Sequence, residues 1–133
     1  MAGILVYERE HVKIHYEEEV QAVYLEWKGF ATSREFRQAC EKSLEELVSR
    51  GLSRMIADNR AAKAVAPTDS KWLSDHWFPR AITAGLRHSA VILSSSALNQ
   101  HASNSISRRV KGIDFHAENF SELTAARAWL ASL

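Results

Sequence analysis

RMIADNRAAKAVAPTDSKWLSDHWFPRAITAGLRHSAVIL, residues Arg54 to Leu93, is the segment that decides the fold. It contains two short apolar runs, Met55–Ala57 and Ala90–Leu93, in which apolar and polar residues do not alternate. Such runs are typical of strands that are buried on both faces, as in the middle of a parallel sheet. Between them a helical pattern begins near Pro67, is interrupted at Pro79, and ends at Gly85. The segment therefore predicts a strand–helix–strand unit.

The residues before this unit have the pattern of an antiparallel meander. Apolar and polar residues alternate over 12–16 and again over 20–27, and a short apolar run at 4–7 precedes them. Alternation of this kind is typical of strands with one buried face. The sequence Thr32–Glu35 is a capping box, which predicts the start of an amphipathic helix that ends at Gly51.

The residues after the unit predict the remaining elements. Ser94–Ser96 are expected to cap a third helix, and Ile113–His116 to form the last strand. Asn119–Glu122 has the pattern of a second capping box, before a final helix. The fold class predicted is α/β, with an antiparallel N-terminal meander, parallel central strands and about four helices in a mixed sheet. At 133 residues the chain is expected to form one domain, residues 1–133.

The composition is that of an ordinary globular domain. The hydrophobic fraction is 46%, the charged fraction 25% and the formal net charge +1, which argues against disorder and gives no sign of a nucleic-acid partner. The apolar runs are too short to predict a membrane span, and the N-terminus lacks the pattern of a signal peptide. The single cysteine, Cys40, suits a reducing compartment, so we expect a cytoplasmic protein.

Several segments together resemble a known family. LEWKGF (25–30), IADNR (56–60) and above all WFPRAITAGLRHSAVIL (77–93) are similar to small bacterial SpoIIAA-like proteins, which are related to STAS domains. The resemblance extends from about Val20 to the C-terminus. It implies a mixed sheet with helices on it, a bacterial cytoplasmic setting and no catalysis. The architecture is shared with CRAL-TRIO lipid-transfer domains, which makes a ligand groove conceivable.

The resemblance also implies a regulatory phosphorylation site. Family members carry a Ser or Thr in a D-S-S-G pattern after the central strand, at a helix N-terminus, where an anion is favoured. This chain departs from the pattern, because Asn59 and Arg60 follow Asp58. Thr68 and Ser70, near the predicted helix start, are the nearest hydroxyl groups and therefore the candidate sites.

A binding site is predicted where the central strands end. Ligands of open α/β sheets bind at the carboxyl edge of the strands. Asp58, Asn59 and Arg60 follow one apolar run, and Ser94 and Ser95 follow the next. The alternative is that Asp58 and Arg60 only cap loops or pair with each other.

The aromatic residues of the central helix provide a second candidate. Trp72 and Trp77 are five residues apart, roughly 140° around a helix, so a single buried stripe accommodates both poorly. We expect one to be buried and the other to lie at an interface or groove.

Metal and covalent chemistry are not predicted. His11 and His15 are expected on one strand face, but the histidines lack the spacing of a metal site, so no metal or cofactor is expected. Cys40 lies on the apolar stripe of its helix and is expected in the core.

The functional prediction is a non-enzymatic, STAS-like interaction or regulatory module. It would bind a protein partner or, through an unpaired strand edge, a second copy of itself. The alternative is a carrier of a small apolar molecule or lipid, with a groove beside the helix of Trp72 to Phe78. An enzyme centred on Asp58 and a histidine is the least favoured hypothesis. A wide apolar pocket lined by Trp72 or Trp77 would favour the carrier, and a flat apolar patch at the same place would favour the interaction module.

Overall fold

The computed structural model describes residues 3–63, 65–93 and 115–133. Its strands form a single mixed sheet with the order β1-β2-β3-β4-β5-β6. They span β1 Ile4–Arg9, β2 Val12–Glu17, β3 Ala22–Gly29, β4 Arg54–Ala62, β5 His88–Ile92 and β6 His116–Phe120. The first three strands are antiparallel and the remaining neighbours are parallel. The predicted α/β fold with a mixed sheet is therefore confirmed.

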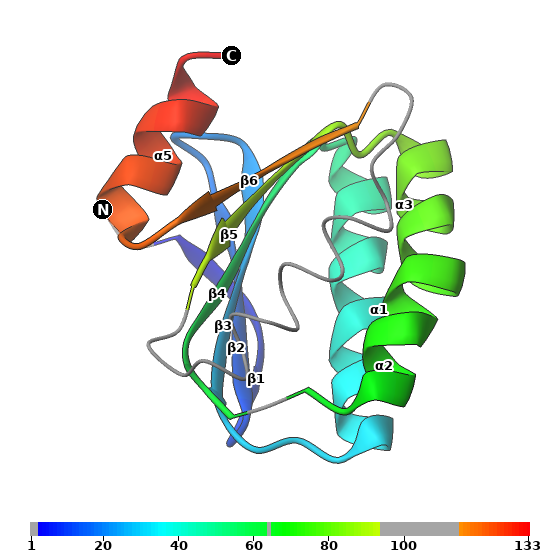
Figure 1. Cartoon of the computed structure of the whole chain (residues 1–133). Helices are drawn as coiled ribbons and strands as arrows, with labels where there is room; N and C mark the ends of the chain where they lie inside the picture. The colour runs from blue at the N-terminus through cyan, green and yellow to red at the C-terminus, as the bar shows by residue number, and fades with distance from the viewer. Residues whose placement is uncertain (1–2, 64, 94–114) are drawn as a thin grey trace.

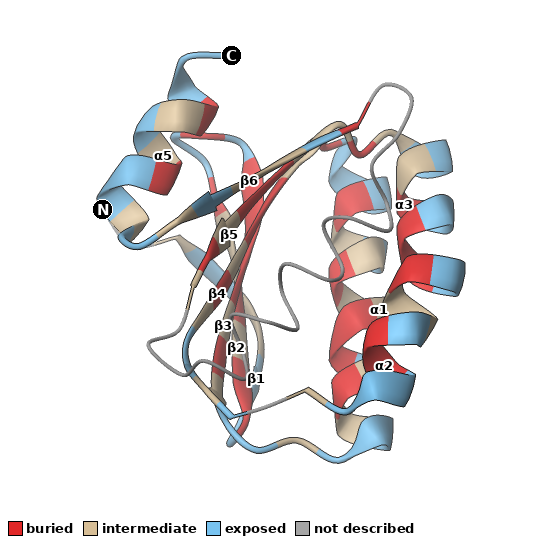
Figure 2. Ribbon diagram, viewed as in Figure 1, coloured by how far each residue is buried: buried red, intermediate tan, exposed pale blue. Residues whose placement is uncertain are grey.

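Helices cover both faces of the sheet (Figure 1). They are α1 Ser33–Arg50, α2 Pro67–Trp72, the π-helical turn η1 Leu73–Trp77, α3 Phe78–Ala84 and α5 Leu123–Ala131. The run from α2 through η1 to α3 is continuous and lies beside α1 on one face, while α5 lies on the other. Buried residues gather on the sides of these helices that face the sheet (Figure 2). The described residues thus form three layers with two cores.

The two cores differ in size. The larger lies between the sheet and the helical layer that α1 and the α2–α3 run form together. It contains Trp27, Phe36, Met55 and Trp77. The smaller lies under α5 and contains Tyr24, Ile56, Ala90 and Leu130, among others. Met55 and Ile56, which are consecutive, enter different cores, as expected of a central strand that is buried on both faces.

Local signals position α1. Thr32 accepts a hydrogen bond from the amide of Glu35 and the Glu35 side chain accepts one from the amide of Thr32, so the capping box is formed. Gly51 ends the helix in the left-handed conformation, at φ 62°, which glycine adopts without strain.

The proline in the central helix is accommodated by the π turn. Pro79 is the second residue of α3 and has no amide hydrogen, so it interrupts the backbone hydrogen bonding of the continuous run from α2 to α3. The preceding π turn over Leu73–Trp77 takes up the interruption that the sequence predicted as a kink or a new helix.

The C-terminal boundaries differ from those predicted. β6 runs from His116 to Phe120 and pairs with β5, with Phe120 opposite Ile92. Asn119 is therefore in a strand, and the predicted second capping box is not formed, since α5 has Glu122 at its N-cap with no side-chain hydrogen bond. Strand pairing has overridden the local capping pattern. The helix predicted after Ser94–Ser96 and the start of the last predicted strand lie outside the described residues.

No helix in the described part of the chain is both long and apolar enough to cross a membrane.

Candidate functional site

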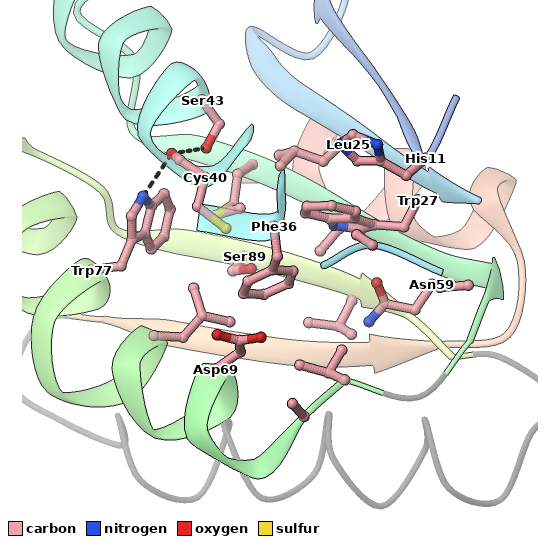
Figure 3. A pocket seen from close by; sticks show the side chains of 18 of the residues that line it. His11, Leu25, Trp27, Phe36, Cys40, Ser43, Asn59, Asp69, Trp77 and Ser89 are labelled. Carbon is pink, nitrogen blue, oxygen red and sulfur yellow. Dashed lines mark hydrogen bonds between the residues drawn. The ribbon is translucent and has the colours of Figure 1, made fainter. Parts of the chain in front are cut away.

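A pocket of about 100 Å³ lies between the sheet and the α1 and α2–α3 layer (Figure 3). Its sheet wall is made by residues of four neighbouring strands, Leu25, Trp27, Met55, Ala57, Asn59, Ser89, Val91 and Ala117. Its helical wall is made by Phe36, Cys40, Ser43, Asp69, Leu73, Trp77 and Phe78. Most of these side chains are apolar, and the pocket is therefore suited to an apolar molecule.

The mouth of the pocket is at the carboxyl edge of the central strands. Gly29 at the end of β3, Lys63 after β4 and Ala66 before α2 line it and are exposed. The Lys63 amide donates a 2.7 Å hydrogen bond to the Gly29 carbonyl, which holds the two strand ends together. This is the edge at which open α/β sheets bind ligands.

Aromatic rings give the pocket rigid walls. Trp27 of β3 stacks on Phe36 of α1, with ring centroids 5.0 Å apart. Trp77 meets Phe78 edge to face at 4.9 Å, and Phe78 contacts Phe115 at 5.5 Å. Aromatic pairs in these geometries add to the stabilisation that burial provides.

Trp77 is anchored to α1. Its exposed fraction is 1%, and its Nε1 donates a 2.7 Å hydrogen bond to the carbonyl of Cys40. The hydroxyl of Ser43 donates to the same carbonyl at 2.7 Å. Both bonds are visible in Figure 3. The indole is thus buried with its polar atom satisfied, and it holds η1 against the middle of α1.

Asp69 is a buried carboxylate in the helical wall, and its charge is compensated. It accepts hydrogen bonds from the Ser33 hydroxyl at 2.8 Å and from Nε of Arg37 at 3.1 Å. The Arg37 guanidinium also lies 5.1 Å above the ring of Trp72. Asp69 therefore links α2 to the start of α1.

His11 provides a polar atom without a partner. The imidazole is 7% exposed and lines the pocket, and its Nε2 is buried with no hydrogen bond to any described residue. On the other side of the ring, Nδ1 lies 3.9 Å from Oε2 of Glu35. The hydrogen bond from the Thr32 amide lowers the pKa of Glu35, with a smaller contribution from His11, so Glu35 is ionised at neutral pH.

The predicted residues of β4 are divided between the two faces. Asn59 lines the pocket, whereas Asp58 and Arg60 lie on the α5 side of the sheet. Asp58 does not end its strand, because β4 continues to Ala62. Arg60 donates to both Asp58 oxygens, at 3.0 and 2.7 Å, which is the pairing given above as the alternative.

Tyr24 completes this polar cluster. Its hydroxyl donates a 2.7 Å hydrogen bond to Oδ2 of Asp58, which is 3% exposed. Burial alone would raise the pKa of Asp58, but the bonds from Arg60 and Tyr24 outweigh it and hold the pKa below its ordinary value. Burial, followed by the contact with Asp58, raises the pKa of Tyr24. Both oxygens of Asp58 are therefore paired within the protein.

The other candidates are placed as follows. Trp77 is in the pocket wall, and Trp72 is partly buried beneath Arg37. Ser70 is buried, and Thr68 is exposed in the first turn of α2. Ser94 and Ser95 lie outside the described residues.

The histidine pair does not share a face. His11 is in the turn before β2 and lies against the pocket, while His15 pairs with Tyr24 in β3 on the opposite face. Within residues 3–63, 65–93 and 115–133, no three ligand side chains are grouped as a metal site would require. Cys40 is buried, and burial raises the pKa of its thiol, which makes it a poor nucleophile.

His11, Trp27 and Phe36 were not predicted as site residues. Trp27 and Phe36 have the pattern of core residues. In the structure they belong to the larger core and also line the pocket. His11 precedes the alternating strand, and only the geometry of the turn brings it to the pocket.

Neither a scan against protein-family models nor a search of curated proteins returned a match to this chain.

Proposed function

We propose that this protein binds a small, mainly apolar molecule in the pocket between the sheet and the α1 and α2–α3 layer. The observation that carries the proposal is the pocket itself, whose apolar and aromatic walls open at the carboxyl edge of the central strands. Trp77 is one of the wall residues, which is the feature that favours a carrier over an interaction module.

The size of the pocket limits the ligand. Pockets for drug-sized molecules hold about 300–1,000 Å³, and a cavity of about 150 Å³ accepts benzene. A pocket of about 100 Å³ with an open mouth therefore suits a ligand near the size of one small ring, and not an entire fatty acyl chain. We further propose that binding occurs without catalysis.

The tryptophans allow a direct test with a model ligand. In a ¹H–¹⁵N NMR titration with toluene, we expect the indole N–H signals of Trp27 and Trp77 to shift, because both line the pocket. The indole signal of Trp129 serves as the internal control, since Trp129 lies on the α5 side. The absence of shifts, or equal shifts at all indoles, would contradict the proposal.

Native mass spectrometry tests for a resident ligand. The protein purified without refolding should show an added mass that is lost on denaturation. A bare monomer would leave the toluene titration as the deciding measurement.

A protein-interaction module is our second candidate function. β1 is an edge strand, and its Ile4 and Leu5 side chains are 46% and 48% exposed. Unpaired edges with apolar side chains favour pairing with another chain, and a second copy is the simplest partner. In the same native mass spectra, a dimer that is disrupted by Leu5→Lys would support this function, and a monomer at all concentrations would argue against self-association.

A further inference from the structure

We propose that the ligand carries one carboxylate, as a small aromatic acid does, and that this group stays at the mouth of the pocket and pairs with the ammonium group of Lys63. The inference rests on the proposed function, because it assigns the chemistry of the molecule that occupies the same pocket. Its basis is a cationic side chain at the exposed rim of a mainly apolar site.

The first step is the position of Lys63. Its backbone amide donates a 2.7 Å hydrogen bond to the Gly29 carbonyl, so its backbone is held where β3 and β4 end. Both residues line the mouth of the pocket and are exposed. The flexible four-carbon stem of the lysine therefore lets its ammonium group reach a ligand group that projects from the opening.

The second step is that the charge of Lys63 has no acidic partner among the residues that the structure describes. Lys13, Lys42 and Lys71 each form an ion pair with a nearby glutamate or aspartate, whereas the Lys63 side chain forms none with a described residue. Of the described residues that line the pocket, Lys63 is also the only lysine or arginine. An anionic group of the ligand can therefore pair with it without displacing another carboxylate.

The third step is the place of the negative charge in the bound ligand. The pocket of about 100 Å³ has room for about one small ring. Burying an anion costs far more than burying an apolar ring, and Asp69 already places a carboxylate in the helical wall. The ring of the ligand therefore enters the pocket, and its carboxylate stays at the rim, where both water and Lys63 can contact it.

The test compares benzoate with toluene, which has a methyl group in place of the carboxylate. Dissociation constants of both would be measured at pH 7 by NMR titration for the native protein and for Lys63→Met, from the indole signals of Trp27 and Trp77. The ratio of the two constants in one protein, divided by the ratio in the other, removes the difference in hydration between the ligands. An ion pair at an exposed rim predicts that Lys63→Met weakens benzoate about twofold to fivefold more than it weakens toluene.

Two further variants control for charge. Lys63→Arg keeps the positive charge and should retain most of the preference for benzoate. Lys28, next to Gly29 in β3, is not a lining residue, and its side chain forms no ion pair with a described residue. Lys28→Met therefore changes the net charge as Lys63→Met does, and we expect it to leave the preference for benzoate nearly unchanged.

Two readouts need no variant. The ¹³C signal of Lys63 Cε should shift on addition of benzoate and much less on addition of toluene. Raising the salt concentration from about 0.01 M to about 0.1 M shortens the screening length from about 30 Å to about 10 Å, so the preference for benzoate should decrease. A preference that does not change with salt would contradict an ion pair at the rim.

The outcomes separate the inference from the function on which it rests. If toluene shifts the Trp27 and Trp77 signals but the preference for benzoate does not depend on Lys63, or depends equally on Lys28, the carboxylate assignment is wrong and the pocket stands. If benzylamine binds more tightly than benzoate, the ligand is a cation and the assignment is again wrong. If neither benzoate nor toluene binds, the proposed function fails as well.

Discussion

The hydroxyl of Tyr24 in β3 donates a 2.7 Å hydrogen bond to Oδ2 of Asp58 in β4, on the face of the sheet that α5 covers. Arg60 donates to both oxygens of the same carboxylate, so a buried charge is satisfied by two different strands. A buried carboxylate is tolerated only when it is paired in this manner.

Removing the Tyr24 hydroxyl tests the importance of this contact. We expect Tyr24→Phe to lower the free energy of unfolding by about 1–3 kcal/mol, because the bond is made to a charged group. Urea denaturation at pH 7 measures the change. Tyr16→Phe is the matched control, since the partly buried Tyr16 ring packs under Arg50 and no hydrogen bond from its hydroxyl to a described residue is seen. Equal effects of the two substitutions would contradict a special role for the Tyr24 bond.

The same carboxylate predicts a dependence of stability on pH. The pKa of Asp58 in the folded protein is below its ordinary value of 3.8. Its stabilising contribution is therefore fully present above about pH 4 and is lost as the pH falls through the folded-state pKa. Asp58→Asn should lower stability at pH 7 and flatten the decline of unfolding free energy between about pH 4 and pH 2. Glu45→Gln, at an exposed carboxylate, should leave the slope close to that of the native protein.

Trp77 joins the α2–α3 helical run to α1. Trp77→Phe removes the donor to the Cys40 carbonyl and leaves a space in the core, so we expect a loss of about 2–3 kcal/mol in unfolding free energy. Trp72→Phe should cost about 1 kcal/mol or less, because Trp72 is only partly buried and mainly loses its contact with Arg37. Thermal and urea unfolding of both variants would show whether this order holds.

Filling the pocket should abolish binding without unfolding the protein. Ala57 is on the β4 wall, and Ala57→Leu extends a larger apolar side chain into the space. We expect the affinity for toluene to fall at least about tenfold and the unfolding free energy to change by about 1 kcal/mol or less, because the side chain enters empty space. Ala125→Leu, at an exposed position of α5, is the control. Unchanged toluene binding in Ala57→Leu would place the ligand elsewhere.

Local signals account for the parts of the fold that were predicted well. The Thr32–Glu35 capping box, the left-handed Gly51 and the first-turn Pro67 act over one helical turn, and each is found where the sequence places it. The C-terminal pattern at Asn119–Glu122 failed because Phe120 pairs with β5, where its carbonyl accepts a bond from the Leu93 amide at 2.8 Å. A capping pattern involves only neighbouring residues, so it contains no information about a strand partner that is distant in sequence.

By itself the sequence determined the α/β class, the antiparallel meander and the helix boundaries near Thr32, Gly51 and Pro67, because periodicity and capping are properties of neighbouring residues. Only the tertiary structure decided which side chains form the site. The apolar run Met55–Ala57 has no alternation, so it could not show that Asn59 faces the pocket and Asp58 the opposite core. Likewise a turn, and not a strand, directs His11 to the pocket. The face that a residue occupies depends on which helices pack against each side of the sheet, and that packing is a long-range property.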